Sequence, residues 1–226
     1  MKICTLCPRM CAVDRKSGER GICGQTTEIK VARAALHFWE EPCISGEMGS
    51  GAVFFSGCAL HCVFCQNENI ANGTAGKVIS TERLGEIFLE LQEKGANNIN
   101  LVTPGQFVPQ IIKAVELARN QNLKIPIVYN TSSYENVDTI RSLEGIVDIY
   151  LPDFKYFDTA LSAKYSHAPD YPAVAKAVIA EMVRQTGAAV FENGEDSLMK
   201  RGTIVRHLIL PGCTKDSKAV LKYLHE

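Results

Sequence analysis

Three closely spaced cysteines constrain the fold of this chain more than any other feature. They lie in Gly57-Cys58-Ala59-Leu60-His61-Cys62-Val63-Phe64-Cys65, directly after the apolar run at 52–55. Iron–sulfur clusters normally take four cysteines, so a C-x3-C-x2-C set with no obvious fourth ligand nearby predicts a [4Fe-4S] cluster that keeps one iron open. The alternatives are three buried thiols or a zinc knuckle. A zinc knuckle would want a fourth Cys or His, and His61 lies too close between two ligands to serve easily.

The size and composition of the chain favour a single domain in a reducing compartment. Its 226 residues, 46% of them hydrophobic, can bury one good core, and its net charge of −1 gives no sign of a nucleic-acid or membrane partner. The chain starts directly with Met1-Lys2-Ile3-Cys4 and resembles neither an export signal nor a membrane span. We therefore expect a cytoplasmic protein whose nine cysteines include metal-bound thiolates rather than a disulfide framework.

A second group of cysteines lies at the N-terminus, in the pattern Cys4-x2-Cys7-x3-Cys11-x11-Cys23. The surrounding glycines and charged residues leave little apolar material for a core, so bound metal would hold this segment together. Four cysteines suit either tetrahedral zinc or a closed iron–sulfur cluster, and the spacing alone does not choose between them. A cluster would serve as an electron relay or a peptide-binding group, and zinc as a structural clip. Cys43 either replaces one of the four or is a lone buried thiol.

The rest of the chain alternates between strand and helix patterns. Apolar runs predict strands at 52–55, 98–103, 125–129, 146–151 and 203–210. Helical patterns fall between and after them, from an N-cap at Thr81 to a stop at Gly95, over 108–115, over 137–143, from near Pro172, and over 214–223. Residues 30–51 are interpreted as a connecting stretch, and 156–171 as a polar loop over the mouth. The pattern predicts an α/β fold, a partial (β/α) barrel of five to six parallel strands.

The cysteine motif and the text around it resemble a known family. C-x3-C-x-aromatic-C, with Phe64 as the aromatic, is similar to the signature of radical S-adenosylmethionine (SAM) enzymes. The stretches at 49–58, 98–104 and 148–156 resemble one branch, the proteins described as pyruvate formate-lyase activating enzymes of the "X" type. The resemblance implies a radical SAM barrel over 46–226, preceded by a small cysteine-rich metal-binding segment over 1–45. That barrel normally has six strands, so we expect the core to lack its last one.

Polar residues at the predicted strand ends give candidate SAM ligands, because chemistry in such barrels gathers at the carboxyl ends of the strands. Asn100 and Thr103 lie where the family keeps a Gly-Gly-Glu-Pro-like stretch that holds the methionine amino group. The resemblance implies that their oxygens bind SAM; the alternative is an ordinary strand-end turn. The branch would have Thr-His at the next two positions, and this chain has Gly105-Gln106, so proton transfer by a histidine there is absent.

Further candidates follow the third and fourth predicted strands. Glycyl-radical activating enzymes carry Asp-Thr-Asn-Gly and Asp-x-Lys motifs at these places, so the resemblance implies that Asn130, Thr131 and Asp153 border SAM, with or without a monovalent cation. By the same resemblance Lys155 would meet the SAM carboxylate or the substrate. A buried Asp–Lys pair is costly unless something uses both charges, which favours a functional site over the alternative of a surface pair.

Arg206 and His207 lie in the last predicted strand, where period-two alternation puts neighbours on opposite faces. By similarity to the activating enzymes we expect Arg206 to face the lumen and bind the SAM carboxylate bidentately, with His207 facing outward. His37, His167 and His225 show no ligand spacing and are interpreted as structural or solvated.

The resemblance implies an oxidoreductase that cleaves SAM reductively at a [4Fe-4S] cluster, with Asp153 and Lys155 as catalytic residues. A one-electron donor such as flavodoxin or ferredoxin would reduce the cluster, and the 5′-deoxyadenosyl radical would abstract hydrogen from a substrate. The branch implies a backbone glycine of a partner glycyl-radical enzyme. The alternatives are another protein, a peptide or a small molecule as substrate, or a non-catalytic iron–sulfur or zinc protein that carries electrons or acts as a scaffold.

Overall fold

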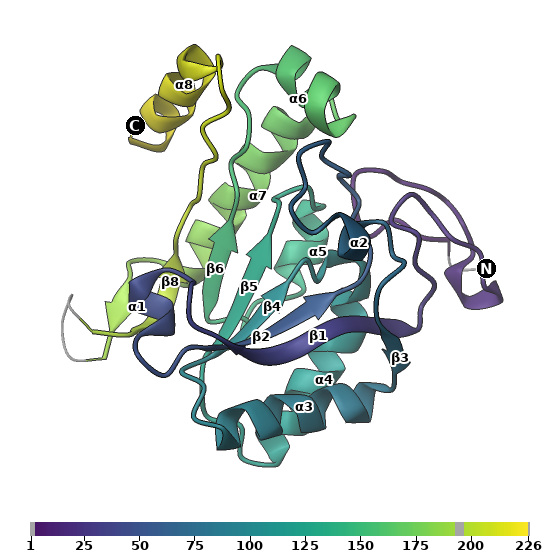
Figure 1. Ribbon diagram of the computed structural model, residues 1–226, viewed down its shortest axis with the longest axis vertical. Coiled ribbons are helices and arrows are strands. Elements are labelled where there is room, and N and C mark those ends of the chain that lie inside the picture. The colour runs from purple at the N-terminus through teal and green to yellow at the C-terminus, as the bar shows by residue number, and fades with distance from the viewer. Residues whose placement is uncertain (1–2, 193–196, 226) are drawn as a thin grey trace.

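The computed structural model describes residues 3–192 and 197–225. Over these residues it forms one mixed sheet in the strand order β3-β1-β2-β4-β5-β6-β8-β7 (Figure 1). The strands are β1 (Ile29–His37), β2 (Ser50–Phe55), β3 (Lys77–Ile79), β4 (Ile99–Val102), β5 (Ile127–Thr131), β6 (Ile149–Pro152), β7 (Val190–Phe191) and β8 (Met199–Thr203). The helices are α1 (Pro42–Ser45), α2 (Glu68–Ala71), α3 (Thr81–Glu93), α4 (Val108–Asn120), α5 (Val137–Arg141), α6 (Thr159–Ser166), α7 (Tyr171–Thr186) and α8 (Thr214–His225).

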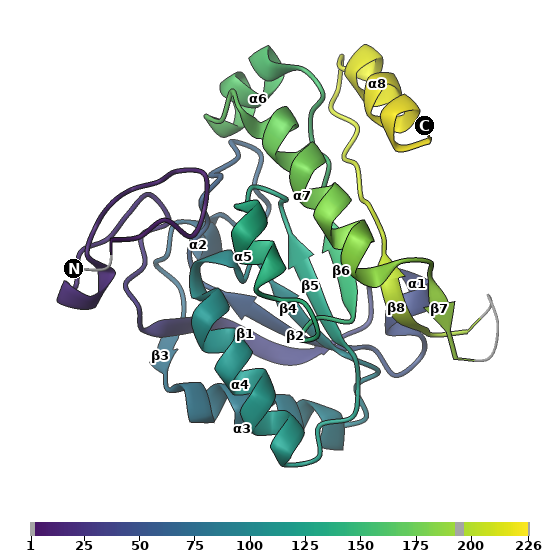
Figure 2. The same cartoon turned by 180° about the vertical axis from the view of Figure 1, so that it is seen from behind.

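The centre of the sheet is parallel. β2, β4, β5, β6 and β8 pair in parallel, each with the next, while β1, β3 and β7 add antiparallel strands at the edges. Figure 2 shows α3, α4, α5 and α7 covering the outer face. The α/β fold with a mostly parallel sheet agrees with the expectation from the sequence. An expected consequence is that the carboxyl ends of five strands meet at one edge.

One face of the sheet packs against the helices, and the other, concave face carries polar residues toward the strand ends. On β4, Ile99 and Leu101 point into the main core beneath the helices. Asn100, which alternates with them, is fully buried on the concave face. Lower on that face, Ile44 of α1 packs with Val128 of β5 and Leu151 of β6, so α1 closes the floor of the barrel. The concave face is therefore apolar at its floor and polar toward the strand ends.

Three local predictions were wrong. Residues 29–37, expected to be a connection, form β1, which pairs with β2 from Val31↔Phe55 to His37↔Ser50. The final strand is Met199–Thr203 rather than 203–210, because Gly202 pairs with Ile149 of β6 and this pairing outweighs the weak strand pattern of the segment. The expected loop at 156–171 contains α6, whose N-cap Asp158 accepts hydrogen bonds from the Ala160 and Leu161 N–H groups. A smaller difference is that Ser80, and not Thr81, caps α3.

The segment before β1 packs against the side of the sheet beside α2 and α5 in both views (Figures 1 and 2). Because β1 already belongs to the sheet, the segment that stands apart from it ends near residue 28. The predicted boundary at 45/46 stays a prediction. Among the described residues, every helix is too short or too polar to cross a membrane.

Candidate active site

A cavity of about 520 Å³ opens at the carboxyl edge of the parallel strands. It is bordered by the cysteine loop after β2 and by the ends of β4, β5 and β6. Ten of the predicted site residues line it: Cys58, Cys62, Phe64, Cys65, Thr103, Asn130, Thr131, Asp153, Lys155 and Arg206. Asn100 was predicted with them, but it is fully buried within β4 and does not line the cavity; its side chain interacts with Glu40. The other four predicted residues, Cys4, Cys7, Cys11 and Cys23, also lie outside this lining. The structure thus brings together residues spread over about 150 positions of sequence.

Hydrogen bonds converge on the sulfur atoms of the cysteine loop. The Leu60 N–H lies 3.4 Å from the Cys58 sulfur, and the Ser166 hydroxyl donates to the Cys62 sulfur at 2.9 Å. Burial raises the pKa of both thiols, while these hydrogen bonds, and for Cys62 the charge of Lys155, oppose the shift. Donors aimed at sulfur stabilise a thiolate, and they are found around metal-bound cysteines. The donors at Cys58 and Cys62, and the cavity that both share with Cys65, therefore fit the open [4Fe-4S] cluster predicted from the spacing.

The loop is held against α6 and an aromatic cluster. The Val63 N–H donates to the Tyr165 carbonyl at 2.9 Å. Phe64 lies with its ring centroid 6.5 Å from those of Tyr156 and Tyr165. Below the loop, Leu60 is fully buried. The aromatic residue of the motif thus anchors the loop and also lines the cavity.

A network of charges crosses the cavity opposite the cysteines. Asp153 accepts from the Lys155 ammonium at 2.7 Å and from the Arg206 Nε at 3.1 Å. Arg206 also donates to the Asn130 side-chain oxygen at 2.6 Å. Burial would lower the pKa of Lys155, but the charges of Asp153 and Cys62 outweigh it and raise this pKa above its ordinary value. Lys155 therefore stays protonated, and its ammonium group is paired with Asp153.

Backbone pairing between Asp153 and Arg206 fixes the positions of these two charged residues. Beyond the end of β8, Asp153 and Arg206 form an isolated parallel bridge, in which the Phe154 N–H donates to the Arg206 carbonyl at 2.7 Å. His207, the next residue, turns away and contacts the Phe154 carbonyl and the Ser217 hydroxyl at 2.7 and 2.9 Å. Under the turn, the buried Tyr171 hydroxyl accepts from the Lys155 N–H and donates to the Asp153 carbonyl. The Tyr171 hydroxyl thus holds the turn that carries Asp153 and Lys155 in place.

The remaining predicted ligands differ in how free their side chains are. Thr103 follows β4 in the left-handed region, with φ of 54°, and its N–H donates to the Asn130 carbonyl. The Thr131 hydroxyl donates to the carboxylate of buried Glu135 at 2.8 Å, so it is already engaged. The contribution of these residues to SAM binding stays a prediction, as do the roles of Asp153, Lys155 and Arg206.

Several residues of the site were not found from sequence. Glu40 and Glu41 reach Arg206 with N–O distances of 3.7 and 3.8 Å, and His37, predicted to be structural or solvated, lines the cavity. Burial raises the pKa of Glu40, although Arg206 opposes the shift. Gln106 donates to three backbone carbonyls around the strand ends. The signal that could have found the acidic pair is the Glu40-Glu41 doublet before Pro42, once β1 is recognised as a strand leading to the cavity.

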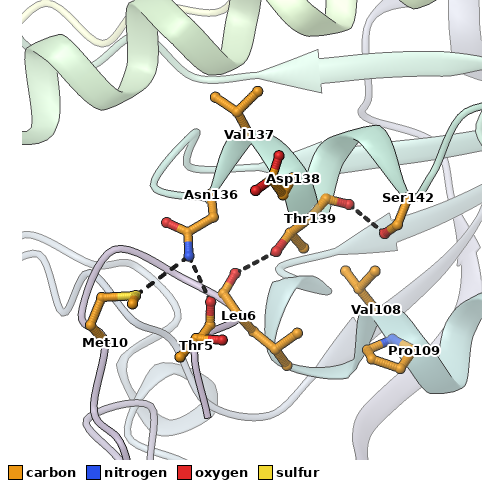
Figure 3. Close-up of a pocket in the computed structure, with 10 residues that line it drawn as sticks. All are labelled: Thr5, Leu6, Met10, Val108, Pro109, Asn136, Val137, Asp138, Thr139 and Ser142. Carbon is orange, nitrogen blue, oxygen red and sulfur yellow. Dashed lines mark hydrogen bonds between the residues drawn. The ribbon is translucent and has the colours of Figure 1, made fainter.

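The N-terminal cysteines lie on the other side of the cysteine loop. Cys4, Cys7, Cys23 and Cys58 line one small cavity together. Figure 3 shows how the segment is attached to α5: Asn136 donates to the Thr5 carbonyl at 2.7 Å, and Thr139 donates to the Leu6 carbonyl at 2.8 Å. Cys43 lies in α1, on the opposite side of the sheet from the N-terminal segment in both views (Figures 1 and 2), and packs near Ile44.

Comparison with known proteins connects this geometry to a family. Residues 52–223 match the family model of the Radical SAM superfamily. The chain is also similar to an uncharacterised protein of Methanocaldococcus jannaschii, with 27% identity over 217 residues. That alignment covers 93% of this chain and 57% of the relative, so the chain spans little more than half the length of the curated protein it matches.

Proposed function

From the premise that this chain belongs to the radical SAM superfamily, we propose that Cys58, Cys62 and Cys65 hold the catalytic [4Fe-4S] cluster and that the cavity beside them binds SAM. The family supports an enzyme that uses SAM radical chemistry. When bound, the reduced cluster and SAM together supply a 5′-deoxyadenosyl radical that abstracts hydrogen from a substrate. The other tasks, which are binding, orientation and exclusion of water, belong to the side chains of this chain.

The observation that carries the proposal is the shared cavity of the three thiols and the Asp153–Lys155–Arg206 network. A ligand with a carboxylate meets two cations there, and a ligand with a sulfonium meets the carboxylate of Asp153. The charges and donors of the site therefore complement the two charged ends of SAM.

We propose further that the substrate is a polypeptide, and specifically the glycine of a glycyl-radical enzyme. The Asp-x-Lys arrangement of Asp153 and Lys155 resembles that of activating enzymes. Exposed apolar side chains lie nearby: Leu208, which lines the cavity, is 50% exposed, and Phe38 (52%) and Trp39 (88%) lie in the chain between His37 and Glu40, which also line it. Exposed apolar groups of this size around a polar cavity are typical of a surface that receives another protein. Flavodoxin or ferredoxin is the proposed one-electron donor.

The first test measures SAM cleavage under anaerobic conditions. The protein is reconstituted with iron and sulfide, reduced and given SAM, and 5′-deoxyadenosine is quantified. We expect product from the wild type, none from Cys58→Ala/Cys62→Ala/Cys65→Ala, and weakened SAM binding in Arg206→Gln. Lys218→Gln, an exposed change on α8, is the matched control for the loss of a positive charge. A wild-type protein that assembles its cluster but neither binds nor cleaves SAM would overturn the proposal in favour of a non-catalytic iron–sulfur protein.

The second test concerns the substrate. A glycyl-radical enzyme such as pyruvate formate-lyase is prepared with deuterium at the α-carbon of glycine and incubated with the reduced protein and SAM. We expect deuterium in the 5′-deoxyadenosine and a glycyl-radical signal in electron paramagnetic resonance (EPR). Product formation without deuterium transfer from any glycyl-radical enzyme tested would count against this substrate class and favour another protein, a peptide or a small molecule.

A further inference from the structure

Three of the four N-terminal cysteines line a small buried space directly behind the catalytic loop. Cys4, Cys7 and Cys23 line this space together with Cys58. Cys58 also lines the proposed SAM cavity, so this one residue forms part of the wall between the two. Cys11 does not line this space; its sulfur lies beside Gly21 and Ile22, directly before Cys23 in the chain. This segment has no apolar core of its own. Something other than apolar packing must therefore bring its four thiols together.

Backbone donors point at the sulfur atoms of this group. The Ile22 N–H lies 3.4 Å from the Cys11 sulfur. The Cys7 and Cys23 sulfurs receive the N–H groups of Arg9 and Gln25, each two residues farther along the chain. The same two-residue offset joins the Leu60 N–H to the Cys58 sulfur in the catalytic loop. Both cysteine groups thus have backbones shaped to stabilise thiolates.

A buried and unpartnered carboxylate oxygen faces the same space. Glu135 lines the cavity and is only 5% exposed. Its Oε1 accepts from the Tyr129 and Thr131 hydroxyls, while its Oε2 has no partner. A buried polar atom without a partner is costly, so this oxygen marks a place that a further group or a water molecule can enter.

Two arginines fix the N-terminal segment to the barrel through backbone carbonyls. Arg9 donates to the carbonyls of Ala59, Ser166 and His167, at 2.8, 3.1 and 2.6 Å. Arg15, which is 5% exposed, donates to those of Gln25, Thr26 and Gln106. The segment is therefore held in place on the catalytic loop, and its cysteines have a defined position relative to Cys58.

We propose that Cys4, Cys7, Cys11 and Cys23 hold a second iron–sulfur cluster, which lies behind Cys58 and outside the SAM cavity. The position of these cysteines directly behind the catalytic loop suits a cluster that passes electrons, whereas zinc carries none. Four thiolates leave no open iron, so this cluster is of the closed type. The proposal goes beyond the proposed function and does not depend on SAM cleavage.

The test removes the catalytic site and leaves the N-terminal segment untouched. Full-length Cys58→Ala/Cys62→Ala/Cys65→Ala is reconstituted anaerobically with iron and sulfide in the presence of zinc, and all three are quantified. We expect about four iron atoms and about four sulfides per chain, against about eight of each in the wild type. A triple variant that holds zinc without sulfide, or no metal at all, would overturn the proposal. SAM cleavage does not enter this readout, so it is independent of the proposed function.

Two double variants test which cysteines bind the second cluster, and EPR tests where this cluster lies. Cys7→Ser/Cys23→Ser should retain about four irons, and Cys43→Ser/Cys213→Ser, which alters the two remaining cysteines, should retain about eight. After reduction, the wild-type EPR spectrum should show magnetic interaction beyond the sum of the spectra of the two single-site variants. A wild-type spectrum equal to that sum would overturn the placement behind Cys58.

Discussion

The buried carboxyl group of Glu135 should make the stability of this fold fall as the pH rises. Burial raises its pKa from 4.5 to about 7, and the hydroxyls of Thr131 and Tyr129 oppose the shift. The protonated form is therefore favoured by folding. The contribution to stability is fully present below the unfolded pKa of 4.5 and is lost as the pH rises through about 7.

The magnitude follows from the difference between the two pKa values. A difference of about 2.5 units at about 1.36 kcal/mol each gives about 3.4 kcal/mol in total. About 2.5 kcal/mol of this falls between about pH 5 and about pH 8, because the loss is already under way at the lower value and complete near the upper one. Glu135→Gln has the shape of the protonated acid and does not titrate. It should therefore gain about this much stability over the wild type across the range.

The assay is urea unfolding of the protein reconstituted anaerobically with iron and sulfide, at several pH values, followed by circular dichroism. The stability difference between Glu135→Gln and the wild type is plotted against pH, so that titration of all other groups cancels. Glu116→Gln, an exposed change on α4, controls for the loss of one carboxylate. Parallel curves for the wild type and Glu135→Gln would refute the reasoning, since they would mean that the carboxyl group does not titrate in this range.

Two further predictions concern the residues through which the cysteine loop packs against its neighbours. Gln106→Leu should lower the unfolding free energy by about 3 kcal/mol in urea, because three buried carbonyls lose their donor; an unchanged midpoint would contradict this. Gly57→Ala should cost more than Gly145→Ala and also reduce iron binding after reconstitution, because its new Cβ would overlap the Cys23 carbonyl, whereas Gly145, with a similar positive φ, has nothing within 4 Å. Equal losses in the two alanine variants would show that only backbone strain matters.

The sequence predicted the parts of the site that short-range patterns determine. The spacing of Cys58, Cys62 and Cys65 requires only a local loop, and the apolar run before it predicts the strand that positions this loop. Alternation along one extended segment separates Arg206 from His207 even though the segment is not a regular strand, because one isolated bridge suffices to orient it. The order of parallel strands also follows from the strand–helix alternation.

The parts that were missed depend on contacts between distant segments. β1 is an antiparallel strand beside β2, and only this pairing shows that Glu40 ends up beside Arg206, 166 positions later in the sequence. Glu135 lies in a polar stretch typical of a surface turn, and its burial depends on docking of the N-terminal segment. Likewise, the position of the final strand is set by pairing with β6 and not by its own composition.

The contacts of Arg206 support the proposal that the cavity takes an exchangeable carboxylate ligand. Its bonds to Asp153 and Asn130, at 3.1 and 2.6 Å, hold one edge of the guanidinium and aim the side chain across the cavity. Its Nη1 has only the distant oxygens of Glu40 and Glu41, at 3.7 and 3.8 Å, which are beyond good hydrogen-bonding distance. An incoming carboxylate would therefore displace weak contacts rather than strong ones, and could be bound without disturbing the bonds that orient the arginine. By the same argument, Glu40 and Glu41 occupy the place that the anionic end of the proposed ligand would take, which accounts for two partly buried carboxylates beside Arg206.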